Sequence, residues 1–181
     1  MTLKRLFRRD PHAKPARALY EAAVEQARSP AFYTALGVPD TVDGRFELIA
    51  LHGFLVMHRL KTELGEGPPL AQALFDFMFA DMDAALREMG AGDLGVGRRV
   101  KTMAKSFLGR VAAYEAGLAD PDAAALDSAL RRNLYGTVEP GPADLAAMAG
   151  YVRAATGLLA GQTGGGFLAG QIQFPAIPGR R

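Results

Sequence analysis

The chain has 181 residues, of which 49% are hydrophobic and 22% charged, and it contains no cysteine. This length suits one globular domain that buries a core without covalent cross-links, and the missing cysteine excludes disulfides, thiolate nucleophiles and cysteine-based metal sites. The net charge is +2, but the first 17 residues carry six basic side chains against one acidic one, so the remainder is mildly acidic. This distribution is unlike a nucleic-acid-binding domain, so we expect no specific nucleic-acid partner.

The basic charge lies in an N-terminal arm, residues 1–15, that we expect to be poorly ordered. Charges interrupt its few apolar positions, so the arm lacks the apolar run of about 7–15 residues that marks a secretory signal. Four of its cations could contact an anionic membrane surface, weakly and reversibly because the apolar face of the arm is small. These are Lys4, Arg5, Arg8 and Arg9.

Helical periodicity recurs beyond the arm and convincing period-2 strands are absent, which predicts an all-α fold. Glycine, proline and capping residues divide the pattern into a single-domain helical bundle of about six to seven helices. The expected helices cover residues 16–27, 31–36, 41–64, 70–89, 96–118, 121–134 and 142–159. For the sixth of them, Asp120 is the expected N-cap and Pro121 the first helical residue.

The helix expected over residues 41–64 is apolar nearly all round in its middle, which is typical of a helix buried among others. Asp40 or Thr41 is its expected N-cap. We expect it to be the most buried element of the fold. The side chains expected to be mostly buried are Phe46, Ile49, Phe54, Met57 and Leu60.

The helix expected over residues 70–89 carries two apolar stripes. Phe75 and Phe79 belong to one stripe, and Phe77 and Met78 belong to the other. The favoured interpretation is a helix packed between two neighbours. The alternative is a partner-binding surface, since methionine and phenylalanine adapt to varied partners.

The C-terminal region is expected to differ from the helical domain, which we place at residues 16–160. Residues 161–170 are rich in glycine and predict a flexible linker. Together with a proline-containing tail that is loose or docked, they form a third segment, residues 161–181.

Sequence motifs that would indicate catalysis or a cofactor lack the neighbouring elements or residues that such sites require. Residues Gly90 to Gly95 match a GxGxxG pattern, but a dinucleotide site needs a preceding strand. The histidines His52 and His58 lie six positions apart, and neither follows a glutamate by three residues, as a di-iron helix bundle requires. We therefore predict no metal, no cofactor and no enzymatic activity.

Two long blocks of sequence resemble the ubiquinol–cytochrome c chaperone family. They are residues 28–61 (RSPAFYTALGVPDTVDGRFELIALHGFLVMHRLK) and residues 73–118, which begin ALFDFMFADMDAALREMG. The segment ALRRNLY at 129–135 continues the resemblance, which covers residues 16–136 in total. Mitochondrial members of the family assist cytochrome b biogenesis.

The resemblance implies an α-helical assembly chaperone that binds newly made cytochrome b and promotes biogenesis of the cytochrome bc1 complex. The small size and the lack of a long presequence indicate a bacterial member. We expect it to be cytoplasmic, as the absence of cysteine suits, with its basic arm in contact with the inner face of the cytoplasmic membrane. Mitochondrial relatives work with a partner protein near the ribosomal tunnel exit, so the ribosome or a second assembly factor is a further expected partner. Two alternatives remain open: a helical enzyme or cofactor-binding protein, and a ribosome-associated module that uses the basic arm.

A charged region between the fourth and fifth expected helices is the predicted partner-binding patch. It combines an acidic helix face, the glycine-rich turn at residues 90–97 and the first turn of the next helix. Charge complementarity at such a surface selects a partner. The alternative is an ordinary helix surface with a weak pair between Asp83 and Arg87. The predicted residues are Asp76, Asp81, Asp83, Arg87, Asp93, Arg98, Arg99 and Lys101.

Overall fold

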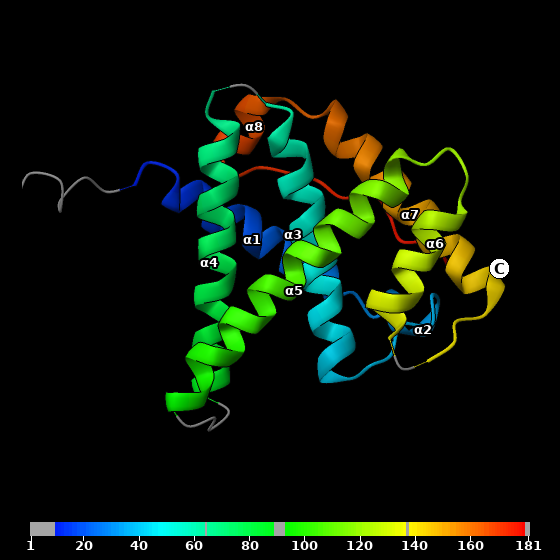
Figure 1. The fold of residues 1–181 in the computed structure, drawn as a ribbon. Helices are drawn as coiled ribbons and strands as arrows, with labels where there is room; N and C mark the ends of the chain where they lie inside the picture. The colour runs from blue at the N-terminus through cyan, green and yellow to red at the C-terminus, as the bar shows by residue number, and fades with distance from the viewer. Residues whose placement is uncertain (1–9, 64, 89–92, 137, 180–181) are drawn as a thin grey trace, which may run out of the picture.

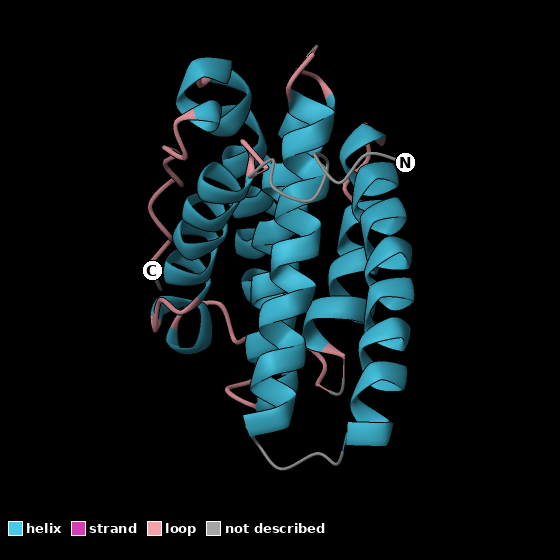
Figure 2. Ribbon diagram, turned by 90° about the vertical axis from the view of Figure 1, so that its left-hand side faces the viewer, coloured by secondary structure: helices cyan, strands magenta, loops and turns pink. Residues whose placement is uncertain are grey.

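A computed structural model describes residues 10–63, 65–88, 93–136 and 138–179, without the side chains of residues 86 and 93–100. The described part is all-α, as predicted, and Figure 2 shows helices joined by loops with no strand among these residues. Six helices have seven residues or more, and two short helices and a π-helix accompany them. They are α1 (Ala13–Ala27), α2 (Ala31–Thr34), α3 (Val42–Lys61), α4 (Gly67–Glu88), α5 (Asp93–Ala119), α6 (Ala124–Leu130), the π-helix η2 (Arg131–Tyr135), α7 (Pro142–Gly161) and α8 (Gly164–Leu168).

The bundle is built around α3. Helices α1, α3 and α4 pack against one another, and α5 leaves α4 and crosses the front of the bundle towards α6 (Figure 1). Helix α7 and η2 pack on another side of α3, so that α3 lies at the centre of the described bundle. None of the helices in the described part combines the length and hydropathy needed to cross a membrane.

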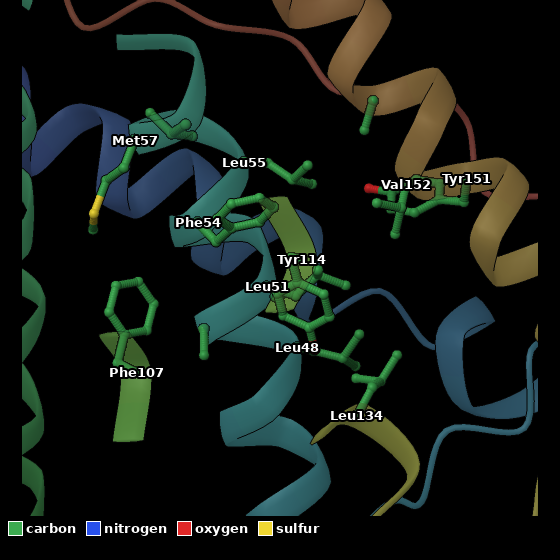
Figure 3. Close-up of a cluster of buried hydrophobic side chains, with 14 of the residues drawn as sticks. Leu48, Leu51, Phe54, Leu55, Met57, Phe107, Tyr114, Leu134, Tyr151 and Val152 are labelled. Carbon is green, nitrogen blue, oxygen red and sulfur yellow. The ribbon is translucent and has the colours of Figure 1, made fainter. Parts of the chain in front are cut away.

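The predictions for α3 are largely confirmed. The Thr41 side chain caps the helix by accepting a hydrogen bond from the backbone of Gly44 at 3.1 Å. Phe54 and Leu60 are buried in a core that also includes residues of α5 and α7 (Figure 3). Phe46 and Ile49 are also mostly buried and pack against the core, and the exposed part of each lines a groove described below.

Helix α4 is sandwiched, as the favoured interpretation of its two stripes predicted. Phe75 and Phe79 lie against Phe107 of α5, with ring centroids 6.0 and 5.8 Å away. On the other stripe, Met78 is fully buried and Phe77 makes an edge contact with Tyr20 of α1. Both stripes therefore contribute to the core.

The start of α6 differs from the prediction. The helix begins at Ala124 with no side-chain cap, so the expected cap at Asp120 is wrong. The Asp120 carboxylate instead accepts a hydrogen bond from the backbone of Asp122, which closes a turn before the helix. Helix α6 packs tightly on α5 because Gly117 has no Cβ; an added Cβ would lie 2.6 Å from the Cα of Leu126.

The C-terminal segment is packed onto the bundle. Residues 161–170, expected to be a flexible linker, contain α8, which Thr163 caps and whose Phe167 is buried. The following tail pairs its backbone at Gln173 with the side chain of Gln162 in both directions. The Phe174 ring lies 5.2 Å from that of His52, so the tail covers part of the core.

A buried hydrogen-bond chain links this tail to three helices. His52 Nδ1 donates to the carbonyl of Leu48 at 2.7 Å, which leaves Nε2 to accept from the hydroxyl of Tyr151 at 2.8 Å. Gln26 donates both to that hydroxyl and to the carbonyl of Pro175. Both nitrogens of the neutral imidazole are therefore hydrogen-bonded, and burial opposes the charged form.

Stability should consequently fall as His52 is forced to take up a proton. Burial lowers the pKa of His52 from 6.5 to about 4 in the folded chain, whereas the unfolded chain binds the proton near pH 6.5. The unfolded state therefore holds more protons between these values, and stability is lost as pH falls. We expect the free energy of unfolding to drop by about 2 kcal/mol between pH 6.5 and pH 5.

Urea unfolding at several pH values between 6.5 and 5 measures the slope of the free energy of unfolding against pH. A His52→Gln variant should flatten this slope, whatever its absolute stability. An unchanged slope in His52→Gln would show that another group titrates.

Candidate functional site

A groove of about 700 Å³ opens among the end of α1, the first half of α3, the second half of α4, α5 and η2. We call this the α3–α5 groove. Its apolar wall is formed by side chains that the core does not completely cover. They include Val42, Phe46, Ile49, Met82, Ala85 and Met103. The two methionines make this wall adaptable, because a methionine side chain is flexible and polarizable.

The apolar wall reaches the surface at the start of α3. Val42 is 73% exposed, the largest exposure among the large hydrophobic side chains of the described residues. Phe46 and Ile49 follow it along the helix and are partly buried. An apolar strip that runs from solvent into a groove is a typical protein-binding feature.

A buried ion pair lies beside this wall. Glu47 is only 8% exposed, and Arg110 binds its carboxylate with two hydrogen bonds, from Nε at 2.6 Å and from Nη2. Burial raises the pKa of Glu47, and the guanidinium opposes that rise. The Arg110 guanidinium also lies 5.9 Å from the ring centroid of Phe46. The pair thus joins α3 to α5 across the groove.

The rim of the groove is polar. The Tyr20 hydroxyl donates to the carboxylate of Asp81 at 2.8 Å, which joins α1 to α4. The π-helix η2 contributes Arg132 and Asn133, and Arg28, which follows the last residue of α1, also lines the groove. A π-helix changes the register of the side chains that follow it, and such segments are frequent at functional sites.

A second hollow is shallower and is lined by His58, Glu115, Arg153, Thr156 and neighbouring residues of α5 and α7. His58 Nδ1 lies 3.5 Å from the Glu115 carboxylate, which also binds Lys61. This hollow lacks the continuous apolar wall of the α3–α5 groove. No group of three metal-binding side chains occurs among the described residues.

The structure separates the predicted partner-binding residues. Asp81 lies at the groove, bound to Tyr20. Asp76 accepts from Gln72, and Asp83 accepts from Arg87 at 2.6 Å. Because α-helical residues advance by about 100° each, Asp81 and Asp83 face opposite sides of α4. Asp81 and Asp83 therefore do not share one face of α4, and the contact of the predicted residues with a partner stays a prediction.

The remaining predicted residues are placed only in part. Lys101 is exposed on α5. The side chains of Asp93, Arg98 and Arg99 lie outside the described ones, as do Lys4, Arg5, Arg8 and Arg9. Helix α5 begins at Asp93, so much of the turn expected over residues 90–97 is helical; residues 89–92 are not described.

The sequence interpretation missed the α3–α5 groove. One signal was present: Glu47 is a lone acid at the edge of the apolar run of α3, and a buried carboxylate needs a cation. The pairing of Glu47 with Arg110 could not be predicted from sequence spacing, because the two residues are 63 positions apart. The π-helix η2 is also not predictable from the sequence pattern, since its residues fit a continuation of α6.

Comparison with known proteins gives consistent matches. The family model described as ubiquinol-cytochrome C chaperone matches residues 34–174. The chain is 25% identical over 135 residues to ubiquinol-cytochrome c reductase complex assembly factor 1 of Mus musculus and of Homo sapiens, and it spans 45% of the length of each. The corresponding Xenopus laevis protein matches at the same identity, over 67% of its length.

A solved structure is also similar. The crystal structure of the Cbp3 homolog from Brucella abortus superposes with a TM-score of 0.82 at 39% sequence identity. The match covers 97% of this chain and 98% of that one. The similarity therefore extends beyond residue 136, where the resemblance identified from the sequence ended.

Proposed function

Because the chain belongs to the ubiquinol-cytochrome c chaperone family, we propose that it is an assembly chaperone of the cytochrome bc1 complex. We propose further that the α3–α5 groove holds a segment of newly made cytochrome b. This assignment of the groove rests on its incompletely covered apolar wall, which runs from exposed Val42 to partly buried Phe46 and Ile49.

The physical argument starts from the needs of a membrane-protein client. Apolar segments of such a client aggregate in water unless a surface shields them. The groove offers an apolar wall beside a polar rim, so a bound segment keeps its polar side towards water. Met82 and Met103 allow the wall to fit more than one side chain.

The groove is held open by bonds that do not involve a client. The Glu47–Arg110 pair joins α3 to α5, and the Tyr20–Asp81 bond joins α1 to α4. A groove that is formed in advance loses less conformational entropy on binding than one that must be ordered. The protein acts by holding and releasing its client, without catalysis, and the basic arm brings it to the inner face of the membrane.

Loss of the gene should therefore lower the amount of assembled cytochrome b. We expect membranes of a deletion strain to lose most of the b-type haem signal of the bc1 complex in a reduced-minus-oxidised spectrum. The gene restored in trans should return the signal, whereas the b-type haem of terminal oxidases should not change. A normal bc1 signal in the deletion strain would contradict the proposed function.

A further inference from the structure

We propose that the seam between α1 and α7 is a second binding site, for an extended peptide segment that has apolar residues at alternate positions and an aromatic residue among them. The C-terminal tail, residues 171–179, fills this seam as an internal occupant, and a segment of a partner protein takes its place when the tail detaches. The inference goes beyond the proposed function. Three residues that hold the tail, Gln26, His52 and Gln162, lie outside the lining of the α3–α5 groove.

The tail runs along α1 and has no helical structure of its own. It follows Gly170, where an added Cβ would lie 2.7 Å from the Cβ of Ala18 near the start of α1. The carbonyl of Pro175 accepts a hydrogen bond from Gln26, near the end of the same helix, at 3.1 Å. At the end of α7, the side chain of Gln162 binds the tail as well. The seam therefore has α1 and α7 as its walls.

Two glutamines recognise the backbone of the tail. The Gln162 amide donates to the carbonyl of Gln173 at 2.8 Å and accepts from its N–H at 2.9 Å, which satisfies both backbone groups of one residue. Gln26 donates to the carbonyl of Pro175, two positions further along. These bonds involve no side chain of the tail, so another segment of the same backbone shape forms them equally well.

Alternate side chains of the tail give the seam its selectivity. Ile172 and Phe174 are partly buried against the core, whereas Gln171 and Gln173 are exposed. This alternation is that of an extended chain lying on a surface. The Phe174 ring meets the ring of His52 edge-on, with the centroids 5.2 Å apart. An occupant of the seam therefore needs an aromatic side chain at this position.

The contacts of the tail are few enough to be exchanged. Among the described residues, its one backbone–backbone hydrogen bond joins Gln171 to Gly166 at 2.8 Å. Its large apolar side chains, Ile172, Phe174 and Ile177, are all only partly buried. Segments with few buried apolar contacts and few backbone bonds open at a lower free energy than the fold as a whole. The tail can therefore leave the seam while the bundle stays folded.

The test uses the full-length protein and a fluorescein-labelled peptide with the sequence of the tail, QIQFPAIPG. In the unaltered protein the tethered tail competes at an effective concentration on the order of millimolar, so the peptide should bind weakly. The variant Ile172→Gln/Phe174→Gln weakens the tail and leaves the walls of the seam intact. Fluorescence anisotropy should show about tenfold tighter binding of the peptide to this variant. Gln173→Ala is the matched control, because its exposed side chain does not bind Gln162; it should bind the peptide as weakly as the unaltered protein.

Two further measurements locate the peptide in the seam. Adding Gln162→Ala to the double variant should weaken binding of the peptide about tenfold, and a peptide with glutamine in place of phenylalanine should lose binding to a similar extent. In NMR spectra of the isotope-labelled unaltered protein, excess unlabelled peptide should move the amide signal of Gln173 to the position of an unfolded chain and leave the signals of α3 in place. This last measurement needs no variant, so it decides the question if the double variant does not fold.

Three results would overturn the inference. They are equal binding of the peptide by the unaltered protein and the folded double variant, equal binding of the two peptides, and a Gln173 signal that does not move in excess peptide. A dimer of the unaltered protein that the peptide dissociates, measured by light scattering, would identify a second copy of this chain as the occupant and would overturn the assignment to a different partner. The haem signal of the deletion strain tests the proposed function separately from all of these results.

Discussion

Glu47→Ala should destabilise the protein by about 3 kcal/mol, because it leaves the Arg110 guanidinium without its carboxylate in a poorly solvated place. Both side chains are mostly shielded, with 11% of Glu47 and 19% of Arg110 exposed. The carboxylate receives two hydrogen bonds from the guanidinium, so both are lost together. Urea unfolding at neutral pH measures the change.

The double variant Glu47→Ala/Arg110→Ala distinguishes the loss of the ion pair from the loss of each side chain's packing. It should be less destabilised than the sum of the two single variants, since no buried charge is left alone. Glu21→Ala is the matched control because the Arg17–Glu21 pair is solvent-exposed, and it should cost less than about 0.5 kcal/mol. Equal losses in Glu47→Ala and Glu21→Ala would mean that the groove pair does not stabilise the fold.

Phe54→Ala should cost about 3–5 kcal/mol of the free energy of unfolding, as large-to-small changes of buried aromatic residues do. Phe54 is 1% exposed, and its ring centroid lies 5.4 Å from that of Tyr114 on α5 and 5.4 Å from that of His58 (Figure 3). The variant would leave a cavity between α3 and α5. Chemical denaturation with a constant m-value is the measurement.

Leu108→Ala is the control for this change. Leu108 lies on α5 but is 59% exposed, so its truncation should cost less than about 0.5 kcal/mol. A loss below about 1 kcal/mol of unfolding free energy in Phe54→Ala would show that Phe54 is not packed in the core between α3 and α5.

The fold was predictable to the extent that local signals set it. Periodic apolar positions and the Thr41 cap predicted α3, and Gly37 marked the preceding turn, where its φ of +66° suits glycine. The C-terminal segment was not predictable, because glycine-rich sequence predicts a linker. The Thr163 cap and burial of Phe167 against Arg59, 5.2 Å from the ring centroid, stabilise a helix there.

The candidate site was less predictable than the fold. The charged patch was inferred from charge density, which does not distinguish the two sides of α4 that Asp81 and Asp83 occupy. The groove depends on contacts between residues far apart in the sequence, such as Glu47 with Arg110 and Tyr20 with Asp81. The family resemblance predicts a protein client, but the position of the α3–α5 groove, which we propose to hold that client, depends on the three-dimensional structure.

The central claim is that the α3–α5 groove holds cytochrome b during assembly. The most direct test complements the deletion strain with Val42→Asp/Ala85→Glu, which places two charges on exposed positions of the apolar wall. Leu108→Glu/Ala112→Glu, at exposed positions of α5 outside the groove, is the control with equal charge. The measurement is the b-type haem signal of the bc1 complex in membranes, at equal abundance of each variant. We predict that the groove variant gives the low signal of the deletion strain and the control the full signal; a full signal from the groove variant would contradict the claim.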